Sequence, residues 1–221
     1  MKLVVLNHKM NLYLDELPTY FSYINKVEEN LIIAPSNIYL LEFIRHSIHP
    51  IASQDICYFE DGNHTGKVSW SQIKSLGIHY SIIGHSEKND SMETTIAKVN
   101  TCLENDITPI LCFGNQSGEN IISVLEKLNI YNKDIIYAYE PIYNIANDNI
   151  DYNDILNNIT SIYNHLKEKG LPDPCIIYGG GINPSNVKKI YDIPILKGIM
   201  IGSKSSDINK LDPILLNIKE K

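Results

Sequence analysis

The stretch Pro109-Ile110-Leu111-Cys112-Phe113-Gly114 is an unbroken apolar run that ends at a glycine. Comparable runs are Leu-Ile-Ile-Ala at 31–34, Ser-Ile-Ile-Gly at 81–84 and Cys-Ile-Ile-Tyr at 175–178. Runs without polar alternation are typical of parallel strands that are buried on both faces of a sheet. Segments of this kind predict strands within 3–7, 31–35, 50–55, 80–85, 108–114, 134–141, 174–181 and 195–202.

Segments with helical spacing lie between these runs. Ile155, Ile159, Ile162 and Leu166 recur at the spacing of one helix face, and Gly170 shortly after them is a helix-stop signal. Similar spacing occurs over 17–24 and 121–128, and 211–221 can supply a final helix. The alternation predicts an α/β protein, a closed (βα)8 TIM barrel that spans residues 1–221 as a single domain. Periodicity alone leaves a doubly wound open sheet as the alternative.

Composition narrows the class of partner. The chain has 221 residues and a formal net charge of -7, which disfavours a nucleic acid partner. No apolar stretch approaches the ~18 residues that a membrane span requires, so we expect no membrane partner. The four cysteines form no CxxC pair, and the histidines show no ligand spacing. We therefore expect no metal site, and we expect reduced thiols and a cytoplasmic location.

Polar residues follow several predicted strands at the end where (βα)8 barrels carry their active sites. Asn7 and Lys9 lie at the end of the first predicted strand, His85 at the end of the fourth and Glu140 at the end of the sixth. Glu140 is a candidate general base, and His85 begins a polar segment whose N–H groups would keep the imidazole neutral. Lys9 supplies positive charge for an enolising, phosphorylated substrate. Together these groups predict proton transfer next to a carbonyl.

Glycine turns follow the last two predicted strands. Gly179-Gly180-Gly181 lets backbone N–H groups approach an anion, and a helix start at 183–185 would add the attraction of its dipole. Gly202-Ser203 can act in the same way beside it. Turns after the seventh and eighth strands commonly bind phosphate in this architecture, so we predict a phosphate site there.

Six motifs give the chain its resemblance to a known family. They are Asn-His-Lys-Met-Asn (7–11), Gly-Asn-His-Thr-Gly-Lys-Val-Ser (62–69), Ile-Gly-His-Ser-Glu (83–87), Pro-Ile-Leu-Cys-Phe-Gly (109–114), Ala-Tyr-Glu-Pro-Ile-Tyr (138–143) and Tyr-Gly-Gly-Gly-Ile (178–182). In this order, and over essentially the whole chain, they resemble the triosephosphate isomerase family. The resemblance implies interconversion of dihydroxyacetone phosphate and D-glyceraldehyde 3-phosphate through an enediolate, a step of glycolysis and gluconeogenesis.

The same resemblance implies a role for each motif residue. Glu140 would move the proton between C1 and C2, and neutral His85 would polarise the carbonyl. Asn7 and Lys9 would complete the electrostatic site, with Glu87 paired to Lys9. Supporting positions in the same motifs are Ser86, Cys112 and Tyr178, and Cys112 is interpreted as a packing residue rather than a nucleophile.

Phosphate binding and assembly are also implied by the resemblance. The phosphate would be held by the backbone around Ala146, Gly180, Gly181, Gly202 and Ser203. The segment after Pro141 would close over the substrate as a lid. The loop around Thr65 matches the one through which family members form homodimers, with Thr65 near Lys9 of the partner. No metal and no organic cofactor is expected.

The chain departs from the family pattern in three places. The lid positions 144–149 read Asn-Ile-Ala-Asn-Asp-Asn, without the two glycines of the family and after Tyr143 in place of Trp. We expect a lid of family length with altered mobility. Lys88-Asn89 occupies the positions of an Arg pair of the family, and the segment that follows it is shorter than in the family. Gly181 and Ser203 replace a Ser and a Gly, and we expect phosphate binding to survive because its donors are backbone N–H groups.

Two alternatives stay open. The altered lid could admit another small phosphorylated carbonyl compound, or the barrel could bind a ligand without turning it over. Retention of Asn7, Lys9, His85 and Glu140 argues against the loss of turnover.

Overall fold

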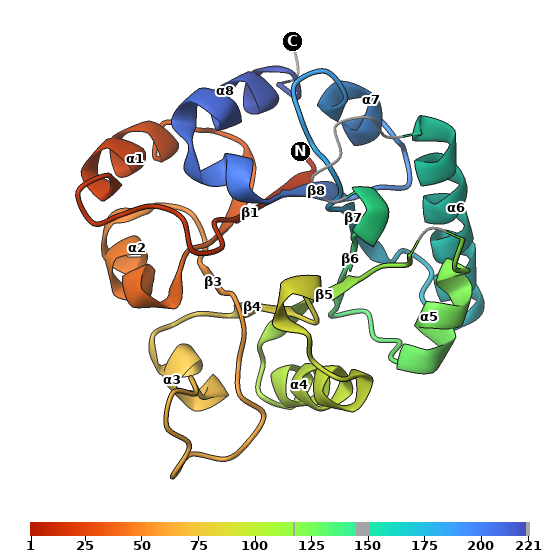
Figure 1. Cartoon of the computed structure of the whole chain (residues 1–221), viewed down its shortest axis with the longest axis horizontal. Helices are drawn as coiled ribbons and strands as arrows, with labels where there is room; N and C mark the ends of the chain where they lie inside the picture. Colours follow the sequence, from red (N-terminus) through yellow and green to blue (C-terminus); the bar gives the residue numbers. More distant parts are fainter. Residues whose placement is uncertain (117, 145–150, 220–221) are drawn as a thin grey trace.

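A computed structural model describes residues 1–116, 118–144 and 151–219. In this part of the chain, strands alternate with helices, and the helices surround a central ring of strands (Figure 1). The strands are β1 (Leu3–Asn7), β2 (Asn30–Ala34), β3 (Ala52–Ser53), β4 (Tyr80–Ile83), β5 (Thr108–Phe113), β6 (Ile136–Tyr139), β7 (Cys175–Tyr178) and β8 (Gly198–Ile201). The α-helices are α1 (Leu17–Ile24), α2 (Leu40–His46), α3 (Trp70–Ser75), α4 (Met92–Glu104), α5 (Ile121–Leu128), α6 (Tyr152–Glu168), α7 (Val187–Tyr191) and α8 (Ile208–Leu216). Short 3-10 helices are η1 (Asn37–Tyr39), η2 (Ser86–Lys88), η3 (Ile142–Asn144) and η4 (Ser203–Ser206).

The strands form one parallel sheet in the order β2-β1-β8-β7-β6-β5-β4-β3. The first and last strands of this order meet at a parallel bridge between Ile33 and Ile51. There the Ile33 amide donates to the Pro50 carbonyl at 2.9 Å. The sheet therefore closes on itself, which confirms the predicted (βα)8 barrel over the open sheet.

Two layers of apolar side chains hold the barrel together. Alternate strand residues such as Val5, Ile110 and Ala138 fill its interior. Their neighbours, such as Val4 and Tyr137, face the surrounding helices. This two-residue alternation decides which side chains point into the mouth of the barrel beyond the strand ends.

Helix α6 buries the apolar face that its sequence spacing predicts. Its four apolar positions, Ile155, Ile159, Ile162 and Leu166, are all buried. The Asp151 side chain caps the start by accepting the Asn153 N–H at 2.9 Å. Gly170 follows its last turn with φ 92°, a conformation that favours glycine.

Some predicted boundaries are wrong. Within the predicted segment 50–55, β3 has only two residues, because Gln54 bonds to the carbonyl of Lys9 and Asp55 pairs with Lys98. The last helix is Ile208–Leu216 rather than 211–221, because the Asp207 side chain caps it by accepting the Asn209 N–H at 3.0 Å. The helix expected at 183–185 begins only at Val187, after a turn in which Asn183 Oδ1 accepts the Ser185 N–H at 2.9 Å.

Candidate active site

Two polar side chains continue the interior face of the barrel at its carboxyl end. Asn7 lies two residues after Val5, and Glu140 two residues after Ala138, both of which face the interior. Residues two apart on a strand share a face, so Asn7 and Glu140 point into the mouth of the barrel. Both are buried, with 4% and 7% of their surfaces exposed. This is the end of the barrel where enzymes of this fold bind substrate.

Lys9 is held in an uncommon backbone conformation beside them. Its φ is 55°, and its N–H is accepted by Asn7 Oδ1 at 3.2 Å. The Gln54 side-chain amide donates to its carbonyl at 2.7 Å and to the Ala34 carbonyl at 2.9 Å. These bonds offset the cost of a left-handed residue without a glycine. The Lys9 ammonium lies 2.5 Å from a carboxylate oxygen of Glu87, so the structure brings together the predicted pair.

The surroundings of His85 favour a neutral ring with its proton on Nε2. The backbone N–H of Glu87 donates to His85 Nδ1 at 3.2 Å, so the ring proton lies on Nε2. Burial, and to a smaller extent the positive charge of Lys9, lower the pKa of His85, while Glu87 raises it. The Nε2–H therefore faces the mouth of the barrel as a hydrogen-bond donor, 3.7 Å from Oε2 of Glu140.

Glu140 has the environment of a general base. Burial raises its pKa to about 7, although Cys112 and Lys9 act in the opposite direction. Among the described residues, its buried Oε2 has no hydrogen-bond partner. A buried carboxylate with one oxygen left open and a pKa near neutrality suits proton abstraction at physiological pH.

Two glycines leave the space that the backbone and side chain of Glu140 occupy. A Cβ on Gly114 would lie 1.9 Å from the Glu140 carbonyl oxygen, and one on Gly179 would lie 2.6 Å from Glu140 Cγ. Cys112, in β5 below the carboxylate, is 3% exposed, and burial raises the pKa of its thiol well above the usual range. A thiol held in its neutral form is a weak nucleophile.

Glycine turns lie at the ends of β7 and β8. Gly181 has φ 52°, and a Cβ on Gly180 would lie 2.6 Å from the Tyr178 hydroxyl. Among the described residues, no acceptor is paired with the backbone N–H of Gly180, Gly181 or Ser203. A Cβ on Gly202 would meet the end of the Lys9 side chain at 3.4 Å, so the turns and Lys9 adjoin one another. Such N–H groups beside a cation can bind an anion.

The remaining predicted positions lie around this centre. Ser86 is exposed, and it lines a pocket of about 200 Å³ that also reaches Glu140. The Tyr178 hydroxyl accepts a hydrogen bond from the Asn144 amide at 3.2 Å. Thr65 is exposed and lies in the segment between β3 and α3. Ala146 and the lid positions 145–149 lie outside the described residues.

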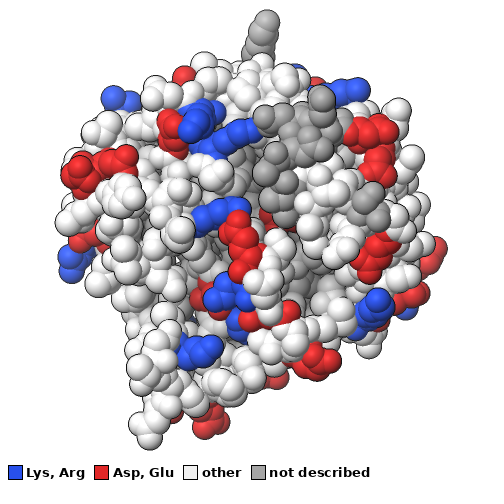
Figure 2. All heavy atoms as spheres, viewed as in Figure 1, with Lys and Arg blue, Asp and Glu red and all other residues white. Residues whose placement is uncertain are grey.

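Charged side chains of both signs are adjacent at the centre of the face viewed in Figure 2. The net charge of -7 is therefore a poor guide to the site, where cations are present locally. The described residues hold no group of three or more His, Cys, Asp or Glu placed to bind a metal ion. No helix among them is long and apolar enough to cross a membrane.

Sequence reasoning missed the positioning roles of Gln54, Gly114 and Gly179. The one sequence signal for Gln54 is its place near the end of the predicted strand segment 50–55. The steric role of the two glycines depends on a neighbouring strand and leaves no sequence signal beyond the glycine itself.

Known proteins with similar sequences share one description. Residues 2–218 match the family model described as triosephosphate isomerase. The triosephosphate isomerase of Orientia tsutsugamushi (strain Ikeda) is 28% identical, and the match covers 98% of each chain. The enzyme of the same name from Trichormus variabilis is 30% identical over 75% of this chain and 74% of that one. The one from Francisella tularensis subsp. mediasiatica is 28% identical over 92% of each.

Proposed function

Because the chain belongs to the triosephosphate isomerase family, we propose that it interconverts dihydroxyacetone phosphate and D-glyceraldehyde 3-phosphate. The single observation that carries the proposal is the pairing of Glu140, a buried base, with His85, a neutral donor, at 3.7 Å. A base and a hydrogen-bond donor side by side at one site are what proton transfer next to a carbonyl requires.

The reaction begins at Glu140. Its carboxylate removes a proton from C1 of dihydroxyacetone phosphate, and the electron pair of the broken C–H bond moves toward the carbonyl oxygen to form an enediolate. The proton of the C1 hydroxyl passes to the oxygen on C2, with His85 Nε2 as the relay, and the protonated carboxyl returns its proton to C2. This leaves the aldehyde at C1 and a hydroxyl at C2. The pKa of about 7 allows Glu140 both to accept and to release the proton near neutral pH.

His85 and Lys9 stabilise the charge that develops on the oxygens. The His85 Nε2–H donates to the carbonyl oxygen. A neutral imidazole is a weaker acid than an imidazolium, so it can stabilise the enediolate oxygen without fully protonating it. The Lys9 ammonium and the Asn7 side chain add positive potential on the same side. Fixed donors of this kind lose little free energy to reorganisation during the reaction.

The phosphate belongs at the turns after β7 and β8. The N–H groups of Gly180, Gly181 and Ser203, which have no acceptor in the described part of the chain, lie next to Gly202 and Lys9 and support this placement. Ala146 remains part of the proposed phosphate contact on the ground of its motif position alone. No cofactor enters the proposed reaction.

A coupled assay that starts from D-glyceraldehyde 3-phosphate tests the proposal. Wild type is expected to turn over, and Glu140→Gln to lose roughly a thousandfold in kcat, since it removes the base. Glu140→Asp, with a shortened base, should fall between them. Equal rates for wild type and Glu140→Gln would refute the assignment. Isomerisation of a different small phosphorylated carbonyl in place of the triose would favour the second candidate substrate class.

The proposal includes a homodimer built on the loop around Thr65, and a cytoplasmic location. Figure 1 shows the segment between β3 and α3 projecting away from the barrel. The two ends of this segment are joined by a hydrogen bond in which the Cys57 N–H donates to the Val68 carbonyl at 2.8 Å. Exposed apolar side chains of the β1–α1 loop, including Met10 at 93% and Tyr13 at 74%, offer a surface for a partner.

Sedimentation equilibrium tests the dimer. We expect twice the chain mass at micromolar concentration, and the single-chain mass for Thr65→Arg. A monomeric wild type with full activity would contradict the dimer and leave the isomerase proposal standing.

A further inference from the structure

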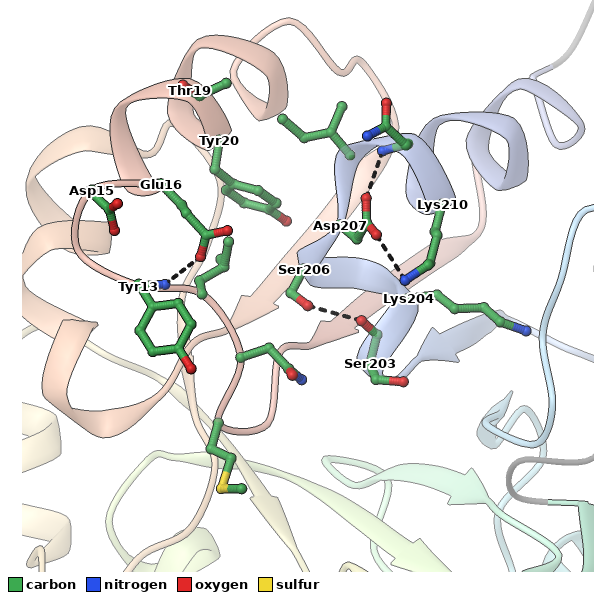
Figure 3. Close-up of a pocket in the computed structure, with 15 residues that line it drawn as sticks. Tyr13, Asp15, Glu16, Thr19, Tyr20, Ser203, Lys204, Ser206, Asp207 and Lys210 are labelled. Atoms are coloured by element: carbon green, nitrogen blue, oxygen red, sulfur yellow. Dashed lines mark hydrogen bonds and ion pairs between the residues drawn. The ribbon is translucent and has the colours of Figure 1, made fainter.

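Tyr20 connects the end of β1 with η4. Its hydroxyl donates to the Ser205 carbonyl at 2.9 Å and lies 2.8 Å from Nε2 of His8. All three residues are buried, with at most 1% of their surfaces exposed. In Figure 3 the Tyr20 side chain extends from α1 toward the turn that carries Ser203 and Ser206, at the wall of a pocket of about 830 Å³. Two segments of the barrel mouth are therefore joined by one buried chain of hydrogen bonds.

The hydrogen bonds of this chain run in one direction. The Tyr20 hydroxyl has a single proton, which the Ser205 carbonyl accepts, so the Tyr20 oxygen accepts from His8. The His8 ring therefore carries its proton on Nε2, and its buried Nδ1 has no partner among the described residues. Burial lowers the pKa of His8 to about 3, which keeps the ring neutral. Edge-on contacts with Tyr20 and Phe43, at centroid distances of 4.9 and 5.4 Å, hold the ring in place.

Both ends of the chain lead to Lys9. His8 directly precedes Lys9, and the His8 N–H donates to the Ala34 carbonyl at 3.1 Å, which fixes its backbone. At the other end, the Ser205 N–H donates to the Gly202 carbonyl at 2.8 Å. A Cβ on Gly202 would lie 3.4 Å from Cε and 3.8 Å from Nζ of Lys9, so the end of the lysine side chain lies beside this glycine. The contacts thus form a closed ring, from the backbone of Lys9 back to its ammonium group.

The Lys9 side chain has few other constraints. A lysine carries its charge on a flexible four-carbon stem. In the described part of the chain, the Lys9 ammonium donates to Glu87 alone, and the Glu87 side chain is 57% exposed. An exposed partner of this kind holds an ammonium weakly. The spacing between the end of β1 and η4 therefore has a large share in placing the Lys9 charge.

We propose that Tyr20 is a positioning residue for Lys9, because it fixes the spacing between the end of β1 and η4 and so the place of the ammonium beside Gly202. The proposal rests on the proposed function, in which Lys9 stabilises the charge on the substrate oxygens. Tyr20 acts through Lys9 and does not touch the substrate. A displacement of about 1 Å can slow an enzyme about a hundredfold, so a smaller shift of the ammonium is enough to be measured.

A double-mutant cycle tests the inference. Tyr20→Phe removes the hydroxyl and keeps the ring, and it is made both in the wild-type chain and in Lys9→Met. Tyr23→Phe is the matched control, because Tyr23 lies on the same helix and its hydroxyl donates to Asp212 of α8 at 3.0 Å. His8→Gln keeps an N–H donor for Tyr20, whereas His8→Phe removes it. For each protein, kcat is measured with D-glyceraldehyde 3-phosphate.

We expect Tyr20→Phe to lower kcat roughly tenfold in the wild-type chain, and by less than about twofold in Lys9→Met, where no ammonium is left to displace. His8→Phe should show part of the loss, and His8→Gln should stay close to wild type. Tyr23→Phe should match wild type. An unchanged kcat in Tyr20→Phe would overturn the inference. An equal loss in both backgrounds would do the same, since it would show that Tyr20 acts independently of Lys9.

A second measurement needs no turnover. Burial raises the pKa of Glu140, whereas Cys112 and the charge of Lys9 lower it, so displacement of the ammonium should raise this pKa further. The titration is followed by NMR of protein labelled at the glutamate carboxyl carbons, with Glu140→Gln to identify the signal.

We expect a higher pKa of Glu140 in Tyr20→Phe and in Lys9→Met than in wild type and Tyr23→Phe. The same pKa in Tyr20→Phe and wild type would contradict the positioning role. A protein that shows the expected differences in pKa but turns over no triose would refute the proposed function and leave the positioning of Lys9 by Tyr20 standing.

Discussion

The side chain of Glu140 occupies the space that a Cβ on Gly179 would need. The distance from that Cβ position to Glu140 Cγ is 2.6 Å, shorter than real carbon contacts. Glu140 follows β6 and Gly179 follows β7, and these strands are neighbours in the barrel. The conformation of the proposed base therefore depends on the absence of a side chain on the adjacent strand.

Gly179→Ala is expected to displace the Glu140 carboxylate and to lower kcat by roughly a hundredfold, the effect of about 1 Å of misplacement. Steady-state kinetics give the rate, and thermal unfolding followed by circular dichroism gives the control. Wild-type kcat in a folded Gly179→Ala would show that the base is not positioned by this contact.

The activity should follow the ionisation of Glu140. The base acts in its charged form, and burial raises its pKa to about 7. We expect kcat/KM to rise tenfold per pH unit below pH 7 and to level off above it. D-glyceraldehyde is the substrate of choice, because it has no phosphate that titrates in the same range. A profile that is flat from pH 5.5 to pH 8 would contradict this assignment.

The buried His8 should make the fold acid-sensitive. Its Nε2 lies 2.8 Å from the Tyr20 hydroxyl, and burial lowers its pKa from 6.5 to about 3. Between these values the unfolded chain binds more protons than the folded one, so the free energy of unfolding falls as pH falls. The loss between pH 7.5 and pH 5 is about 2 kcal/mol.

Urea unfolding at the two pH values measures this loss, with His8→Phe as the control that keeps an aromatic ring in the core. The free energy of unfolding of the variant should fall by about 2 kcal/mol less than that of wild type over the same pH interval. Equal losses in the two proteins would assign the acid sensitivity to other groups.

Gln54 should matter for catalysis although it lies outside the proton-transfer path. Gln54→Leu removes the donor that holds the Lys9 carbonyl and leaves the contact with Asn7 as the remaining support of the strained backbone described at Lys9. We expect kcat/KM to fall roughly tenfold, with a smaller change in thermal stability. Gln54→Glu places an acceptor against two carbonyls and should be at least as impaired. Unaltered kinetics in both variants would show that Lys9 holds its position alone.

The sequence predicts the parts of this molecule that depend on local pattern. The apolar runs locate the strands, and the residues that follow them include Asn7, His85 and Glu140. Contacts between distant residues could not be predicted in the same way, since Gln54 meets Lys9 across 45 positions of the chain. Helices α3 and α7 are six and five residues long, too short for apolar periodicity to reveal them.

The two-residue length of β3 has a consequence for how the barrel opens. Strand β2 joins the β3 region through a single bridge at Ile33 and Ile51, whereas β1 and β2 pair along five residues. The seam beside β3 is therefore where we expect the first sub-global opening and the fastest amide hydrogen exchange within the sheet. Gln54 lies directly after that seam and donates to the carbonyl of Lys9, so each opening would also release Lys9 from this contact. The position of the proposed catalytic lysine would then depend on the stability of the least paired junction of the barrel.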